Sequence, residues 1–152
     1  MRQMASLFIV AVLAACASTR ESGLMLTPSD FSHLKFLEGR WEGSGPDGKP
    51  FYEQYSFPGE GEMRATRFAD ETFEEPKDGS VVTLEAGRVI SKWGDFTWQA
   101  SELGPGKACF APVNAPSSIC WERVSDLVAQ VTQRWTDEDG KPQQYVVPLR
   151  RL

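Results

Sequence analysis

The sequence predicts an all-β protein: a single antiparallel meander β-barrel of about 8–10 strands preceded by one short helix. Three observations predict the antiparallel meander of short strands, which can close into a barrel. Hydrophobic residues alternate with a period of two over most of the chain, and turn-forming Gly, Pro, Asn and Asp separate the short alternating segments. No two of these segments are separated by a helical pattern long enough for a parallel crossover, which excludes βαβ units.

Length and charge narrow the class of protein further. The chain has 152 residues, enough for one domain, and its 41% hydrophobic content is too high for a disordered chain. It carries 16 basic and 21 acidic residues, a formal net charge of −5, and no cluster of Lys or Arg. We therefore expect no nucleic-acid partner.

Residues 1–15 have the features of a signal peptide. Arg2 is followed by an almost unbroken apolar run from Met4 to Ala15. As a helix, this run of roughly 12 residues would extend about 18 Å, well short of the roughly 30 Å of a bilayer core. We predict a secretory signal and not a membrane-spanning helix.

The run Leu13-Ala14-Ala15-Cys16 resembles a bacterial lipobox. The resemblance implies that Cys16 is lipidated and becomes the first residue of the mature chain, and several acyl chains would give a stable membrane anchor. Ala17 is not the Asp that resembles an inner-membrane retention signal, so the expected location is the outer membrane of a bacterial envelope, facing the periplasm. The alternative is ordinary cleavage after an Ala-x-Ala site, which would leave a secreted protein.

The rest of the chain divides into a tether and a domain. Residues 16–27 form the predicted lipidated N-terminus and tether, and residues 28–152 form the barrel domain. The domain opens with a helix start, since Thr27 is a good N-cap, Pro28 suits the first helical position and Asp30 follows at the third. Apolar residues then recur at helical spacing: Phe31, Leu34 and Leu37.

From residue 37 onward the period changes to two. The predicted strands are residues 37–44, 51–57, 62–70, 81–86, 88–93, 96–101, 107–111, 118–124, 127–135 and 143–152. Residues 71–79 between two of them are predicted to be an acidic loop or a mobile lid. A closed barrel would remove the unpaired sheet edges, although a sandwich fits the same strand count.

A resemblance decides between barrel and sandwich. Gly39-Arg40-Trp41 resembles the Gly-x-Trp of the calycins, which include lipocalins, fatty-acid-binding proteins and nitrobindins. The resemblance implies that Gly39 and Trp41 lie on the first strand after a helix that closes one end of a barrel. It also implies that an Arg of the last strand packs across the Trp ring; either Arg150 or Arg151 is available, and we assign Arg150.

A second resemblance concerns the stretch from residue 36 to residue 152. Phe110, Asn114-Ala115-Pro116 and Trp121-Glu122-Arg123 partly match a motif of bacterial lipocalin-like domains of unknown function, which this stretch resembles. The His and the Asp of that motif are absent here. Any site that relatives build on that pair is therefore not expected in this chain.

Two cysteines are predicted to form a disulfide. Cys109 and Cys120 flank a hairpin centred between Asn114 and Ala115, and this register places them directly opposite each other. The same register puts Ala108, Phe110, Ile119 and Trp121 on the other, apolar face. Two free buried thiols are the alternative.

Residues of the presumed inner faces form a candidate ligand site. Glu53 and Arg67 share these faces with aromatic side chains, and an acid facing an Arg can orient the polar group of a ligand. The candidate lining residues are Glu53, Tyr55, Phe57, Arg67, Trp98, Phe110 and Trp121. The alternative is that these aromatics simply fill a small barrel and the charges lie at its rim.

No pattern indicates catalysis, a metal site or a cofactor. The one histidine, His33, lies in the predicted helix and outside any pocket, so a nucleophile–His–acid set is not expected. Haem would require an axial ligand on a strand. We therefore predict that the protein is not an enzyme.

Two functional hypotheses follow from these patterns. The first is an envelope-anchored, lipocalin-like barrel that binds a small hydrophobic or amphipathic molecule, as a monomer. The second is a non-catalytic structural or interaction lipoprotein whose barrel is filled.

Overall fold

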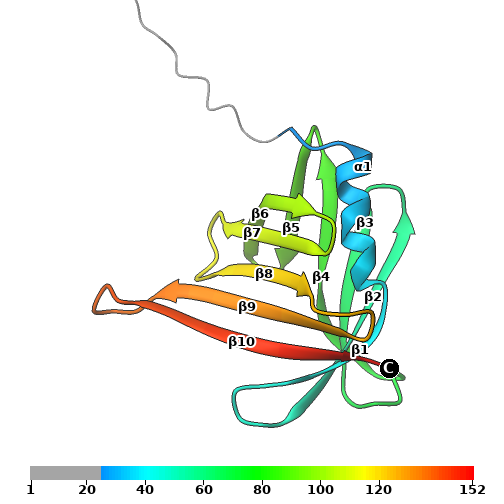
Figure 1. The fold of residues 1–152 in the computed structure, drawn as a ribbon, viewed down its shortest axis with the longest axis vertical. Helices are drawn as coiled ribbons and strands as arrows, with labels where there is room; N and C mark the ends of the chain where they lie inside the picture. The colour runs from blue at the N-terminus through cyan, green and yellow to red at the C-terminus, as the bar shows by residue number, and fades with distance from the viewer. Residues whose placement is uncertain (1–24) are drawn as a thin grey trace, which may run out of the picture.

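The structure, a computed structural model that describes residues 25–152, is a closed antiparallel barrel of ten strands. The strands are β1 (Gly39–Ser44), β2 (Pro50–Gly59), β3 (Glu62–Phe68), β4 (Pro76–Glu85), β5 (Arg88–Trp93), β6 (Phe96–Gly104), β7 (Lys107–Pro112), β8 (Ser118–Arg123), β9 (Val128–Thr136) and β10 (Pro142–Arg151). Each strand pairs with its neighbour in the chain, and β10 returns to pair with β1 (Figure 1). The predicted fold class is confirmed. The predicted signal peptide, Cys16 and most of the tether lie outside the described residues.

The predicted helix forms and closes one end of the barrel. α1 (Pro28–Phe31) continues as a 3₁₀ helix, η1 (Ser32–Leu37), and the Thr27 hydroxyl accepts a hydrogen bond from the Asp30 amide at 3.2 Å. Figure 1 shows the helix beside the end of the barrel where β1 begins. Its apolar face is fully buried: Phe31, Leu34 and Leu37 are at most 4% exposed. None of the helices described in residues 25–152 has the length and apolar character needed to cross a membrane.

Trp41 and Arg151 join the first strand to the last. The Arg151 guanidinium lies 4.2 Å from the centre of the Trp41 ring, which is 1% exposed. Arg151 also donates hydrogen bonds to the carbonyl oxygens of Phe36, at 2.8 Å, and of Glu38. The Trp41 indole donates to the carbonyl oxygen of Leu37 at 2.7 Å. One cation therefore binds the end of η1, β1 and β10 together.

The assignment of Arg150 to this role was wrong, and the pairing register explains why. Across β1 and β10, Arg151 is opposite Trp41 and Arg150 is opposite Glu42. Because successive side chains of a strand point to opposite faces, only Arg151 shares the inner face with Trp41. Arg150 instead forms an ion pair with Glu42 on the outer surface.

Gly39 is needed for this arrangement. Its φ is +125°, and a Cβ at this position would lie 2.8 Å from the Arg151 guanidinium. A side chain here would therefore be strained and would displace the arginine. Both residues of the Gly-x-Trp motif therefore contribute to the contact with Arg151: Trp41 provides the ring and Gly39 leaves room for the guanidinium.

The fourth strand begins earlier than predicted. Pro76 to Gly79 pairs with β3, so that only residues 69–75 remain as a loop between these strands. Phe73 holds this loop against the outer wall, with its ring centre 6.0 Å from that of Tyr52 and 5.1 Å from that of Phe68. The Arg40 guanidinium covers the same ring at 4.7 Å. The predicted acidic segment thus divides into a paired strand and a loop packed on the barrel.

The predicted disulfide is present. Cys109 and Cys120 face each other across β7 and β8 and are bonded, and the neighbouring pairs have the predicted register. On the opposite face, Ala108, Phe110 and Trp121 are buried in the core. The β7–β8 hairpin is therefore cross-linked by the disulfide on its outer face, and its inner face packs in the core.

The contact between Arg151 and Trp41 makes a prediction for stability. Arg151→Ala removes the cation over the ring and leaves carbonyl oxygens at the end of η1 without their donor. We expect it to lower the free energy of unfolding by about 2–3 kcal/mol. Arg150→Ala is the matched control, since its exposed ion pair contributes only about 0–1 kcal/mol. Urea unfolding followed by tryptophan fluorescence measures both values, and equal losses would contradict the assignment.

Candidate functional site

A cavity of about 260 Å³ lies in the barrel toward the end opposite the helix. Its position follows from the lining, which includes Gly45 and Pro46 of the β1–β2 turn and Trp93 at the end of β5. Among the lining residues, Pro46, Asp78 and Gly79 are exposed, so the cavity opens to solvent at this end. Six aromatic side chains form much of its wall: Phe51, Tyr55, Trp93, Trp98, Trp121 and Tyr145. The volume is near the lower limit of small-molecule sites, roughly 300–1,000 Å³.

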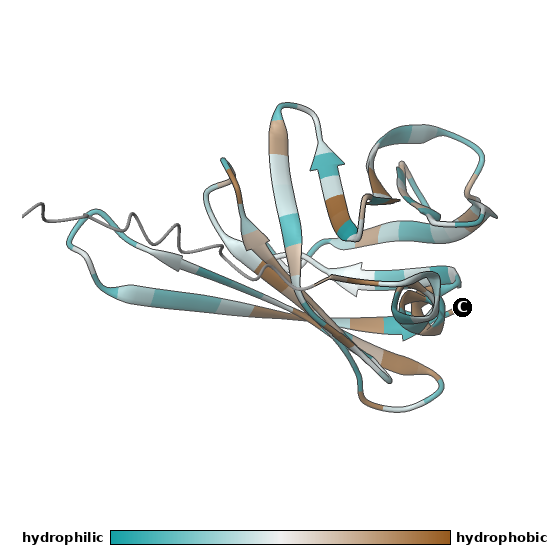
Figure 2. Cartoon of the chain, turned by 90° about the horizontal axis from the view of Figure 1, so that it is seen from above, coloured by the Kyte–Doolittle hydropathy of each residue, from teal (hydrophilic) through white to brown (hydrophobic). Residues whose placement is uncertain are grey.

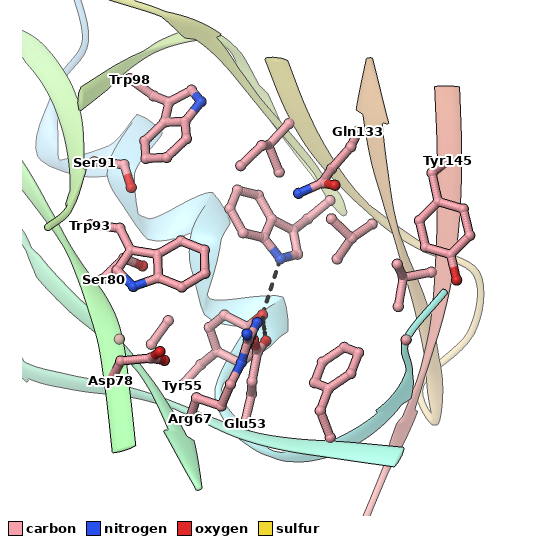
Figure 3. Close-up of a pocket in the computed structure, with 18 of the residues that line it drawn as sticks. Glu53, Tyr55, Arg67, Asp78, Ser80, Ser91, Trp93, Trp98, Gln133 and Tyr145 are labelled. Atoms are coloured by element: carbon pink, nitrogen blue, oxygen red, sulfur yellow. Dashed lines mark hydrogen bonds and ion pairs between the residues drawn. The ribbon is translucent and has the colours of Figure 1, made fainter. Parts of the chain in front are cut away.

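Five of the seven candidate residues line this cavity: Glu53, Tyr55, Arg67, Trp98 and Trp121 (Figure 3). Phe57 does not, because its ring packs on Phe31 of α1 at 6.3 Å, on the helix side of the core. Phe110 does not either; it is 1% exposed and packs edge-on against the Trp121 ring at 5.7 Å. Strand alternation identifies the face of a residue but not its depth along the barrel axis, and both phenylalanines lie outside the cavity lining.

A chain of hydrogen bonds crosses the cavity. Arg67 donates to Glu53 at 2.8 Å, and the Tyr55 hydroxyl donates to the other oxygen of the same carboxylate at 2.7 Å. The Trp121 indole donates to the Tyr55 hydroxyl at 3.1 Å. Figure 3 shows the side chains of Glu53, Tyr55 and Arg67 close together on one side of the site. The chain links β8 to β2 and β3 through the interior and fixes the orientation of each polar side chain.

Arg67 is also held between two aromatic rings. Its guanidinium lies 5.1 Å from the ring centre of Phe51 and 5.2 Å from that of Trp93. Phe51 reaches this position because Gly43 lies beneath it, where a Cβ would approach the ring to 2.2 Å. Two ring faces and one carboxylate therefore stabilise this cation in a half-buried site.

Tyr55 is kept in its neutral form by its surroundings. Burial raises the pKa of the Tyr55 hydroxyl well above its ordinary value of 10.0, and the neighbouring Glu53 carboxylate raises it further. Its proton is held in the hydrogen bond to Glu53. At neutral pH Tyr55 is therefore a hydrogen-bond donor and not a base.

The structure adds site residues that the sequence patterns did not indicate. Asp78 lies opposite Arg67 in the β3–β4 register, and Ser80 and Ser91 line the same side of the cavity as Trp93 (Figure 3). Asp78 was missed because Pro76-Lys77-Asp78-Gly79 has the composition of a turn. Gln133 and Tyr145 lie on the opposite side, from β9 and β10. Continuing the alternation outward from the predicted strand 81–86 would have identified Asp78 and Ser80 as members of one face.

The loops around the open end are strongly acidic. These connections are residues 45–49, 69–75, 94–95, 113–117 and 137–141. They carry nine carboxylates and two lysines: Asp47, Asp70, Glu71, Glu74, Glu75, Asp95, Asp137, Glu138 and Asp139 against Lys49 and Lys141. The β9–β10 hairpin, whose hydrophilic tip holds three of these acids, extends far beyond the rest of the sheet (Figure 2). The four connections at the helix end, residues 60–61, 86–87, 105–106 and 124–127, carry only two acids.

Within residues 25–152, no group of three or more His, Cys, Asp or Glu side chains is arranged to hold a metal ion. His33 lies in η1, at the closed end and away from the cavity.

Comparison with known proteins yields only distant similarities. No protein-family model matches the chain, and no curated protein matches it in sequence. Among solved structures, EF1p2_mFAP2b bound to DFHBI is 13% identical, with a TM-score of 0.40 over 80% of this chain and 98% of that one. A redesigned beta barrel, b11L5F_LGL, is 15% identical, with a TM-score of 0.35 over 79% of this chain and 95% of that one. At these scores neither similarity bears on the ligand of this chain.

The raised pKa of Tyr55 makes a prediction for alkaline stability. Because the folded state favours the protonated hydroxyl, its contribution to stability is fully present below pH 10 and is lost as the pH rises above 10 toward the pKa in the folded state. We expect the free energy of unfolding to fall over this range, and to fall less steeply in Tyr55→Phe. Urea unfolding at a series of pH values tests this, and identical slopes in the two proteins would contradict it.

Proposed function

We propose that this protein is an envelope-anchored barrel that binds a small hydrophobic or amphipathic molecule without transforming it. The observation that carries the proposal is the cavity: a solvent-open space with aromatic walls and a fixed chain of polar groups. Apolar walls with a few oriented polar groups are typical of small-molecule sites.

The polar groups favour binding over catalysis. Arg67 and Glu53 are engaged with each other, and Tyr55 is held protonated. A general base requires a pKa near the working pH. We therefore propose that this chain of groups orients a ligand and stabilises the barrel.

The alternative, a structural lipoprotein with a filled barrel, is less well supported. A filled barrel would bury its aromatic side chains against one another and leave no cavity. Here Trp93 and Phe51 remain half-buried and border open space. The open volume inside the barrel therefore favours the ligand-binding hypothesis over the structural one.

The place where the described residues begin indicates how an anchored barrel would be oriented. Leu26 donates a backbone hydrogen bond to Gly87 in the β4–β5 turn, at the helix end of the barrel. A chain anchored through Cys16 would then hold the closed end toward the membrane. The open end, with the cavity, would face away from it, accessible to a ligand in the periplasm.

A neutral fluorescent probe tests the binding site. N-phenyl-1-naphthylamine should bind saturably, with an increase in its own emission and quenching of the tryptophans that line the cavity. Ala65→Phe fills the cavity from β3 and should weaken this binding by about tenfold or more.

Ala111→Phe is the matched control for this substitution. Ala111 is exposed on β7 and does not line the cavity, so its replacement should leave probe affinity unchanged. Equal affinity of Ala65→Phe and the wild type would contradict the cavity as the binding site.

The anchor is tested separately from the cavity. The chain expressed in a bacterium with labelled fatty acid should incorporate the label and fractionate with the outer membrane. Cys16→Ser should abolish the labelling and release the protein. The double variant Cys109→Ser/Cys120→Ser is the control, since it removes the two disulfide cysteines without removing the proposed acyl acceptor. Incorporation of label into Cys16→Ser would contradict the assignment.

A further inference from the structure

Three ionisable side chains of opposite sign line adjacent strands of the cavity. Glu53 on β2, Arg67 on β3 and Asp78 on β4 are consecutive partners in the sheet register. They therefore point to the same, inner face. The lining thus carries two carboxylates and one guanidinium.

The single cation of the lining is already engaged. Arg67 forms an ion pair with Glu53 at 2.8 Å and lies between the rings of Phe51 and Trp93. An incoming carboxylate would have to displace Glu53 from Arg67, or approach Arg67 alongside Asp78. Either route brings like charges together in a partly buried site, which is unfavourable.

The second carboxylate is available. Among the described residues, Asp78 has no Lys, Arg or His nitrogen within 4.0 Å, although Arg67 is its cross-strand neighbour. It lies at the mouth, on the same side as Trp93, Ser80 and Ser91 (Figure 3). Because the Trp93 ring already interacts with the Arg67 guanidinium, the attraction for a ligand cation on this side comes from the Asp78 carboxylate.

The opposite wall has a different character. Ile119, Val131 and Val147, from β8, β9 and β10, present apolar side chains to the cavity. The cavity is therefore polarised, with an acidic, aromatic side formed by β4 and β5 and an apolar side formed by β8 to β10. A ligand that fits both sides carries a compact charge on an apolar body.

The loops around the mouth favour the same sign of charge. Apart from the projecting β9–β10 hairpin, these loops carry six carboxylates and one lysine, so they concentrate negative charge at the open end of a chain whose overall net charge is −5. Such a field raises the local concentration of cations and lowers that of anions, and it weakens with added salt.

We propose that the cavity selects a small organic cation, an apolar or aromatic body bearing one ammonium group, with the ammonium paired to Asp78 at the mouth and the body against the aromatic and apolar walls. This inference rests on the proposed binding function and specifies its ligand class. It excludes fatty acids and other carboxylates as preferred ligands, a class that the resemblance to fatty-acid-binding proteins would suggest.

A matched series of three probes tests the proposal on the wild-type protein. 1-Naphthylmethylamine, 1-naphthylmethanol and 1-naphthoate share one ring system and differ in charge. Isothermal titration calorimetry at neutral pH should show the amine binding about tenfold more tightly than the alcohol, and the naphthoate more weakly than both. The advantage of the amine should shrink at high salt, whereas the affinity for the alcohol should hold.

Asp78→Asn tests the assigned counter-ion. It should weaken amine binding by about fivefold and leave alcohol binding unchanged. Asp139→Asn is the matched control: this carboxylate lies on the β9–β10 hairpin, is 79% exposed and does not line the cavity. It should change amine affinity by less than about twofold.

The outcomes distinguish a failure of the cation selectivity from a failure of the proposed binding function. If the alcohol binds as tightly as the amine, or the naphthoate binds most tightly, the selection of cations is overturned while the binding function stands. If amine selectivity survives intact in Asp78→Asn, the assigned counter-ion is overturned. If none of the three probes binds, both the binding function and the cation selectivity are overturned.

Discussion

The closure of the barrel depends on one arginine at the seam between its first and last strands. Arg151 covers the Trp41 ring and donates to carbonyl oxygens at the end of the helix, so that one side chain of the last strand joins the helix and the first strand at the other end of the domain. The charge is tolerated there because ring and carbonyl groups replace its lost hydration. Gly39 is fixed by the same contact, because any side chain would occupy the place of the guanidinium.

Sealing one end of the barrel determines what the other end can do. The helix fills the interior near the seam with Phe31, Leu34 and Leu37, which leaves the remaining space toward the opposite loops. At that end the interior is lined by aromatic rings from several strands. The Phe51 ring can pack directly on β1 because Gly43 has no side chain. The cavity is thus the part of the barrel interior that the core side chains do not fill. Its polar groups are the inward-facing residues that strand pairing places at the same height along the barrel axis.

The sequence patterns predicted features that depend on neighbouring residues. They missed features that depend on the pairing of strands far apart in the chain. The helix start at Thr27 and the register of the hairpin bearing Cys109 and Cys120 depend on residues a few positions apart, and both were correct. The choice between the two terminal arginines depends on how β10 pairs with β1, about a hundred residues away, and a shift of one residue reverses it. Asp78 was missed for a related reason, since only its pairing with β3 shows that a turn-like composition belongs to a strand.

The polar network of the interior connects the stability of the barrel with the proposed selection of a ligand. A lone guanidinium or carboxylate at this depth would be destabilising, and each member of the set from Arg67 through Glu53 to Tyr55 satisfies its neighbour. A network that is complete in itself offers little to a ligand of either sign. Under the proposed function, the charge that selects the ligand is the one outside this network, the Asp78 carboxylate at the mouth, near the acidic loops. If the cavity binds a ligand as proposed, the same pairing that stabilises the interior also determines which sign of charge the cavity favours.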